Sequence, residues 1–215
     1  RDDFQDESIA KEAFQDLVQL GVAGIVGPMT SSMAVTLAPL ADAAQRVIIS
    51  PTAVTSELSG RDDHFFRVLA SADEYAAEAA RHHHRILGRR QAAIAIDTAN
   101  HNYTNNWATH YKEAFEREGG RVSTIASFSS VGDKNYEQIA SQLVADSPDI
   151  VILVSSSVDA SLIAEKVRGK LPDIQIAGSA WTATEQLVRL GGPAVEGMQV
   201  EQFFDRHDKS ARYTH

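Results

Sequence analysis

Short apolar runs rich in Val and Ile alternate with helical patterns along nearly the whole chain, and this alternation restricts the possible folds more than any other feature. The run at residues 150–154, IVILV, has no polar residue on either face. Strands buried on both faces are typical of parallel sheets that helices cover. The sequence therefore predicts an α/β fold.

The expected strands are residues 22–26, 46–49, 65–69, 92–96, 122–128, 150–154, 174–177 and 198–203. The expected helices are residues 8–20, 73–87, 103–118, 136–145, 160–168 and 184–190, with one more that opens at residues 30–32.

Two hydroxyl-rich segments follow the first two of these strands. Thr30, Ser31 and Ser32 stand where a helix begins, and the loop at residues 50–56 reads SPTAVTS. Ligands of open α/β sheets bind at the carboxyl ends of parallel strands, and a helix N-terminus attracts anions. Both segments are expected on this edge, so the sequence predicts a site for a small acidic ligand. The alternative for each hydroxyl residue is a helix N-cap.

Composition excludes several other functions. The net charge is −9, and the sequence has no cluster of Lys and Arg of the kind that binds nucleic acid. Cysteine is absent, so thiolate metal sites and cysteine nucleophiles are excluded. The consecutive histidines at 82–84 point in different directions on a helix and predict a solvated helix end rather than a metal site. With no phosphate-binding loop and no GxSxG or HExxH motif, we expect no cofactor, no metal and no catalysis.

An ordered set of motifs resembles the periplasmic substrate-binding proteins of the leucine/isoleucine/valine type, which serve ABC transporters. The motifs are GIVGPMTSS (24–32), VIISPTA (47–53), FFRVL (65–69), AIAIDTANHNYTNNW (93–107), PDIVILVSSSVDASLIA (148–164), IAGSAW (176–181) and AVEGM (194–198). They cover essentially the whole chain in the family's order.

This resemblance implies two Rossmann-like lobes with parallel sheets covered by helices, a ligand in the cleft between them, and closure by hinge bending. We expect a first lobe at residues 1–88, a second at 89–203, and the start of a crossover back to the first lobe at 204–215. From the comparison with the family we expect a fragment or trimmed chain, in which the first lobe lacks its first strand and helix and a returning C-terminal segment. Such a lobe would expose apolar surface that favours self-association.

In the first lobe, the resemblance implies that Ser31 contacts a ligand carboxylate, with Thr30 and Ser32 beside it. The loop at residues 52–55 matches a second carboxylate contact and adds Thr52, Ala53, Val54 and Thr55 to the expected site. Family members often carry a hydroxyl where Val54 stands. This departure weakens the case for an amino-acid ligand.

In the second lobe, Tyr103 matches a tyrosine that lines the cleft, although it could equally pack on its own helix. Ser156, Ser157 and Asp159 follow a buried strand at the ligand-facing edge. Asp159 could hold an ammonium group or simply cap the next helix.

Trp181 offers an apolar face for stacking, and its alternative is a place in the core of the lobe. Amino-acid binders of the family often carry a glutamate where Ala180 stands, and alanine cannot pair with an amine. An aromatic or aliphatic acid is therefore favoured at least as much as an amino acid.

The predicted function is that of an extracytoplasmic, periplasmic solute-binding protein. It would capture a small carboxylate or amino acid and deliver it to the membrane permease of an ABC transporter. No secretory leader is visible in the sequence, which fits a mature or trimmed chain as well as a cytosolic protein. One alternative is the ligand-binding sensor module of a signalling receptor, and a less favoured one is an enzyme of doubly wound fold.

Overall fold

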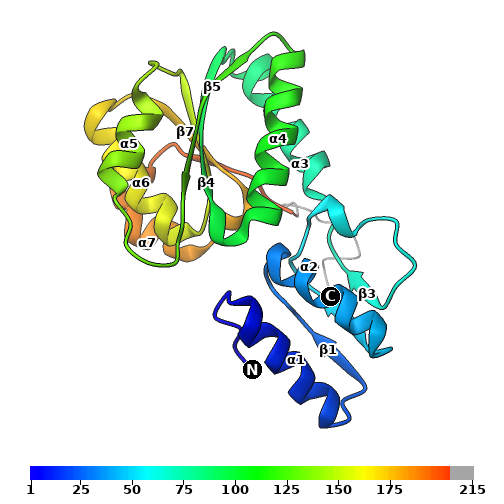
Figure 1. Ribbon diagram of the computed structural model, residues 1–215. Helices are drawn as coiled ribbons and strands as arrows, with labels where there is room; N and C mark the ends of the chain where they lie inside the picture. The colour runs from blue at the N-terminus through cyan, green and yellow to red at the C-terminus, as the bar shows by residue number, and fades with distance from the viewer. Residues whose placement is uncertain (204–215) are drawn as a thin grey trace, which may run out of the picture.

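Figure 1 shows a computed structural model of the chain, in which residues 1–203 are described. The segment 204–215, expected to begin the crossover back to the first lobe, lies outside the described residues. Two groups of elements surround two separate parallel sheets, as the alternation of strands and helices predicts. The α/β fold class is thus confirmed.

The first group, blue to cyan in Figure 1, contains a three-stranded sheet in the order β1-β2-β3. Its elements are α1 (Glu7–Gln19), β1 (Gly24–Val26), α2 (Ser31–Ala43), β2 (Val47–Ser50), the short 3₁₀ helix η1 (Ser56–Leu58) and β3 (Phe65–Arg67). Ile48 and Phe65 point from the sheet into a core shared with Phe14 of α1 and Leu37 of α2. Alternating side chains on these strands therefore face the helices.

The other face of this sheet carries a row of exposed apolar side chains. Val26, Ile49 and Phe66 are 79%, 41% and 54% exposed, and they are neighbours in register across the three strands. Val68 continues this surface beyond the end of β3. No described helix covers it, which agrees with the expectation of an incomplete first lobe.

The second group contains a five-stranded sheet in the order β5-β4-β6-β7-β8. Its strands are β4 (Gln91–Asp97), β5 (Arg121–Phe128), β6 (Ile150–Val154), β7 (Gln175–Gly178) and β8 (Gln199–Val200). Its helices are α3 (Ala72–Arg81), the π-helical turn η2 (His82–Ile86), η3 (Thr98–Asn100), α4 (His101–Arg117), α5 (Tyr136–Val144), α6 (Ser157–Lys170), η4 (Ala180–Thr182), α7 (Glu185–Gly191) and η5 (Gly192–Val195).

Strand β6 lies in the middle of this sheet, and all five of its residues are buried. Ile150, Ile152 and Val154 face the core beneath α3 and α4, whereas Val151 and Leu153 face the core beneath α5 and α6. The unbroken apolar run thus serves two cores on opposite faces of one sheet.

Helix α3 falls inside the range predicted for the first lobe but packs with the second. Ala72, Ala76 and Ala80 belong to the core that also holds Trp107 of α4, and α3 lies beside α4 in Figure 1. The lobe boundary at residue 88 stays a prediction. The packing of α3 favours a chain that passes from the first lobe to the second between β3 and α3.

His83 is buried, in contrast to the solvated helix end predicted for the three histidines. The π-helical turn directs it toward α4, where its Nδ1 lies 2.9 Å from the Tyr111 hydroxyl. Burial, followed by the neighbouring charges of His82 and Arg89, lowers the pKa of His83 to about 4.

This buried imidazole makes the stability of the protein depend on pH. Because the folded pKa of His83 lies below the unfolded value of 6.5, the unfolded state binds more protons between them. The contribution of neutral, buried His83 to the free energy of unfolding is complete above pH 6.5 and disappears as the pH falls toward 4. We expect the free energy of unfolding to lose about 3 kcal/mol over that range from this residue.

Urea denaturation from pH 4 to pH 7 tests this expectation. His83→Asn should be less stable at pH 7 and should lose less stability on acidification than the parent. His101→Asn, at an exposed position, is the control and should follow the parent. Equal acid sensitivity of the parent and His83→Asn would contradict the role of His83.

Candidate functional site

A cavity of about 410 Å³ lies between the loops that follow β1 and β2 on one side and the beginnings of α4 and η4 on the other. It therefore opens at the carboxyl ends of strands from both sheets, which is the usual position of ligands in α/β folds. Its lining residues are Met29, Thr30, Ser31, Thr52, Val54, Asn100, Tyr103, Ala180, Trp181, Thr184 and Phe203.

Six of the residues predicted for the site line this cavity. They are Thr30, Ser31, Thr52, Val54, Tyr103 and Trp181. They come from four separate segments, which the two sheets bring together.

The two hydroxyl-rich loops of the first lobe are tied to each other. Ser31 Oγ accepts a hydrogen bond from Val54 N at 3.2 Å, and Thr52 Oγ1 donates to Met29 O at 2.6 Å. Ser31 is only 1% exposed, at the inner side of the cavity, whereas Thr52 lies exposed at its rim. Because its oxygen is the acceptor in the bond from Val54, the Ser31 hydroxyl keeps its proton available for a ligand.

The N-terminus of α2 meets the cavity at Thr30. This residue occupies the N-cap position, but its side chain makes no capping bond, and its buried Oγ1 has no partner among the described residues. A buried hydroxyl without a partner carries a desolvation cost that a ligand could relieve. Thr30 thus offers a donor beside the positive end of the helix dipole.

Ser32 has a different place from its two neighbours. Its backbone N–H donates to Asn100 Oδ1 at 3.2 Å, and its Oγ accepts from Asn102 N at 3.2 Å. Both partners belong to the second lobe. Ser32 therefore joins the lobes and does not line the cavity.

An aromatic wall forms the second-lobe side of the cavity. The rings of Tyr103 and Trp181 meet edge to face with centroids 5.9 Å apart, and Phe203 lines the same space. The loop that carries Trp181 turns closely at Gly178, where a Cβ would lie 2.3 Å from Thr182 Oγ1. Burial, followed by the negative charge of Glu201, raises the pKa of Tyr103, so its hydroxyl stays protonated and can donate.

Asp159 is occupied elsewhere. Its carboxylate accepts hydrogen bonds from Lys134 Nζ at 3.1 Å and Tyr136 Oη at 2.7 Å. It also accepts from Ser156 Oγ at 2.7 Å, while the Ser156 hydroxyl caps α6 by accepting from Asp159 N at 3.2 Å. Asp159 and Ser156 do not line the cavity: Lys134 and Tyr136 hold the carboxylate of Asp159, and Asp159 holds Ser156.

The remaining predicted residues also lie outside the lining. Ser157 Oγ accepts a hydrogen bond from Oγ1 of the cavity-lining Thr184 at 2.8 Å, and so helps to position that side chain. Thr55 is buried and its Oγ1 accepts from Glu57 N at 3.4 Å, at the start of η1. Ala53 is buried in the core of the first lobe.

Five lining residues were not among the predicted set: Met29, Asn100, Ala180, Thr184 and Phe203. Asn100 ends η3, the short turn after β4, and could have been found by the rule that polar residues after parallel strands gather at one edge. Met29 and Phe203 carry no polar signal, so their places depend on the tertiary fold.

The lining has no charged side chain in the described residues. A bound carboxylate would meet neutral hydroxyl and amide donors, and an ammonium group would find no carboxylate on the wall. The described residues also hold no cluster of three metal-ligating side chains. Among the helices described, none has the length and apolar character that crossing a membrane requires.

The sequence model of a family described as periplasmic binding protein matches residues 1–213. A Leu/Ile/Val-binding protein of Rhizobium johnstonii is 21% identical over 197 residues, which cover 91% of this chain and 53% of that protein. The chain thus spans about half the length of this relative.

Solved structures of similar proteins support the same fold. A leucine-binding protein of Thermotoga maritima superposes with a TM-score of 0.88 at 21% identity, covering 95% of this chain and 58% of that one. An ABC-transporter solute-binding protein of R. palustris in complex with benzoate gives a TM-score of 0.85 at 17% identity, covering 98% and 58%.

The buried contacts of Asp159 make it a stabilising residue. Asp159→Asn should lower the free energy of unfolding by about 2 kcal/mol, because Lys134 then loses the counter-charge to its ammonium group. Glu165→Gln breaks the exposed pair with Lys166 and should cost at most about 0.5 kcal/mol. Urea denaturation of both variants measures the difference, and equal losses would contradict the structural role of Asp159.

Proposed function

The chain belongs to the periplasmic binding protein family, and on that premise we propose that it captures a small carboxylate-bearing solute between its lobes without transforming it. The membership confirms the resemblance predicted from the ordered motifs. The observation that carries the proposal is the cavity between the lobes, lined by neutral hydroxyls on one side and by aromatic rings on the other.

The carboxylate would bind at the first-lobe side. The Ser31 hydroxyl has a free proton, Thr30 Oγ1 is buried without a partner in the described chain, and both lie at the start of α2. Hydrogen bonds from neutral donors to a charged acceptor are stronger than those between neutral groups. The helix dipole adds to this attraction.

The rest of the ligand would lie against Tyr103, Trp181 and Phe203. These rings favour a flat apolar body, and Ala180 provides no charge for an amine. We therefore propose an aromatic monocarboxylate rather than an α-amino acid. The benzoate complex of the R. palustris protein supports this class, whereas the leucine-binding protein of T. maritima represents the competing one.

The cellular setting follows from the family. We propose that the protein works outside the cytoplasm and delivers its ligand to the membrane permease of an ABC transporter. A sensor module of a signalling receptor would use the same cavity, but no described feature favours it.

Calorimetric titration with benzoate, 4-hydroxybenzoate, leucine and benzamide tests the proposed ligand class. Benzoate or 4-hydroxybenzoate should bind, and a hundredfold excess over the dissociation constant should stabilise the protein by about 3 kcal/mol. Benzamide should bind more weakly because it has no charged carboxylate. Leucine should bind more weakly because its ammonium group has no acceptor on the wall.

Ser31→Ala should weaken benzoate binding by about tenfold or more, since it removes one hydrogen bond to a charged group. Ser141→Ala, on the exposed face of α5, is the control and should bind as the parent does. Tighter binding of leucine than of benzoate would contradict the proposed class. Undiminished binding of benzoate by Ser31→Ala would contradict the proposed carboxylate position.

The exposed apolar row of the first sheet suggests a second property, self-association of this chain. Pairing two copies through Val26, Ile49 and Phe66 would remove this surface from water. Light scattering coupled to size exclusion should show a concentration-dependent dimer for the parent and a monomer for Phe66→Lys. Val188→Lys, at an exposed site on α7, should dimerise normally. A parent chain that stays monomeric at its highest attainable concentration contradicts self-association.

A further inference from the structure

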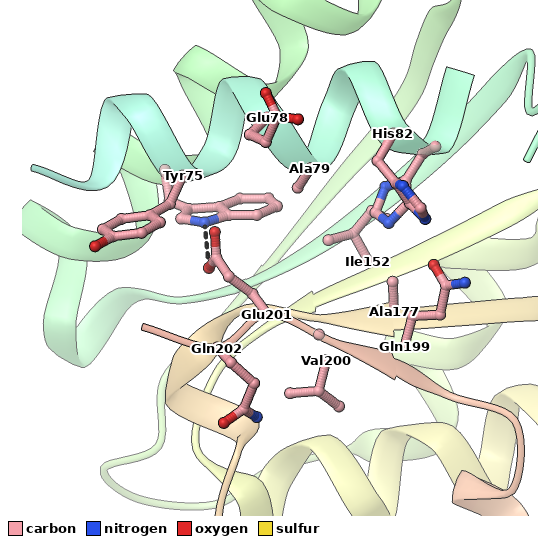
Figure 2. Close-up of a pocket in the computed structure, with 13 residues that line it drawn as sticks. Tyr75, Glu78, Ala79, His82, Ile152, Ala177, Gln199, Val200, Glu201 and Gln202 are labelled. Carbon is pink, nitrogen blue, oxygen red and sulfur yellow. Dashed lines mark hydrogen bonds between the residues drawn. The ribbon is translucent and has the colours of Figure 1, made fainter. Parts of the chain in front are cut away.

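Glu201 stands between the candidate cavity and a second groove on the second lobe. It follows β8 directly, and its Oε2 accepts hydrogen bonds from Ala180 N at 3.1 Å and from Trp107 Nε1 at 3.2 Å. Figure 2 shows Glu201 on the floor of this groove, with Glu78 and His82 on the helix above it. Ala180 lines the cavity, whereas Trp107 lines the groove.

Few described neighbours compensate the negative charge of the Glu201 carboxylate. Its Oε1 is buried and has no partner among the described residues. The groove has a volume of about 440 Å³, and none of the described residues that line it is a Lys or Arg. The titratable groups facing Glu201 are Tyr103 on the cavity side and, along the groove, Tyr75, Glu78, His82 and His83.

None of these groups forms an ion pair with Glu201 in residues 1–203. Burial raises the pKa of Glu201, and the bonds from Ala180 N and Trp107 Nε1 oppose that rise. Within residues 1–203 the negative form is thus held by these two hydrogen bonds, and a nearby anion would favour the protonated form.

The charge of Glu201 reaches the wall of the cavity. Its carboxylate binds the backbone of Ala180, the residue immediately before Trp181. The charge of Glu201 also raises the pKa of Tyr103, an effect second only to burial, and the Tyr103 ring lines the cavity. Because no cationic side chain of the described residues lines the cavity to screen this charge, it would repel an anionic ligand bound there.

We propose that Glu201 takes up one proton when an anionic ligand fills the cavity, so that binding tightens as the pH falls. This inference rests on the proposed function. The carboxylate becomes a carboxylic acid and no other bond changes. The proton can arrive from solvent along the groove that Glu201 lines, so its route does not cross the occupied cavity.

The consequence for affinity follows from linkage between the two sites. Ligand binding and protonation of Glu201 favour each other by the same factor. If the bound anion raises the pKa of Glu201 by about one unit, affinity should increase about tenfold from the basic to the acidic end of the titration. An uncharged ligand should show no such change.

Calorimetric titration of the whole chain with benzoate from pH 5.5 to pH 8 tests the coupling. Repeating each titration in buffers of different ionisation enthalpy measures the protons taken up. The parent should bind about tenfold more tightly at the acidic end, with proton uptake at intermediate pH. Glu201→Gln retains an oxygen to accept from Ala180 N and Trp107 Nε1, so it should bind with the high affinity at every pH and take up no proton.

Glu78→Gln is the matched control, since it removes an exposed carboxylate from the same groove and should keep the pH dependence of the parent. A thermal unfolding curve for each variant establishes that it is folded. Benzoate binding whose pH dependence is equal in the parent and Glu201→Gln overturns the coupling and leaves the proposed function standing. Absence of binding by any aromatic acid at any pH overturns both.

Discussion

Two hydrogen bonds join the first turn of α2 to the residues that begin α4, and the cavity depends on them. Ser32 N donates to Asn100 Oδ1, and Asn102 N donates to Ser32 Oγ. An otherwise unsatisfied N–H of the helix end is thus capped by a residue of the opposite lobe. The same contact sets Ser31 opposite the aromatic wall that contains Tyr103. The two sheets therefore meet where both carry polar loops.

The edge rule for parallel sheets predicted the first-lobe side of this arrangement, and the family resemblance added Tyr103 and Trp181. Ser31, Thr52, Tyr103 and Trp181 lie far apart in sequence, yet each follows a strand at its carboxyl end or opens the next helix, and all four line one cavity. The fold class could be predicted for a similar reason, because continuous Val/Ile runs such as β6 are compatible with few alternatives.

The same reasoning could not decide which polar residues remain available for a ligand. Asp159 follows a strand like the others, but Lys134 and Tyr136, more than twenty residues earlier, occupy its carboxylate. Phe203 reaches the cavity only because β8 brings it there. Local sequence predicts the edge of the sheet at which a side chain lies. Tertiary contacts determine whether that side chain binds another residue or remains available to a ligand.

We propose that a neutral, hydroxyl-lined pocket binds a carboxylate beside an aromatic wall. Crystals grown with 4-bromobenzoate test it most directly, because anomalous scattering locates the bromine without ambiguity. We predict a bromine beside Tyr103 and Trp181 and a carboxylate within hydrogen-bond distance of Ser31 Oγ. A fully occupied bromine outside this cavity, or a carboxylate paired with a lysine or arginine, would contradict the account.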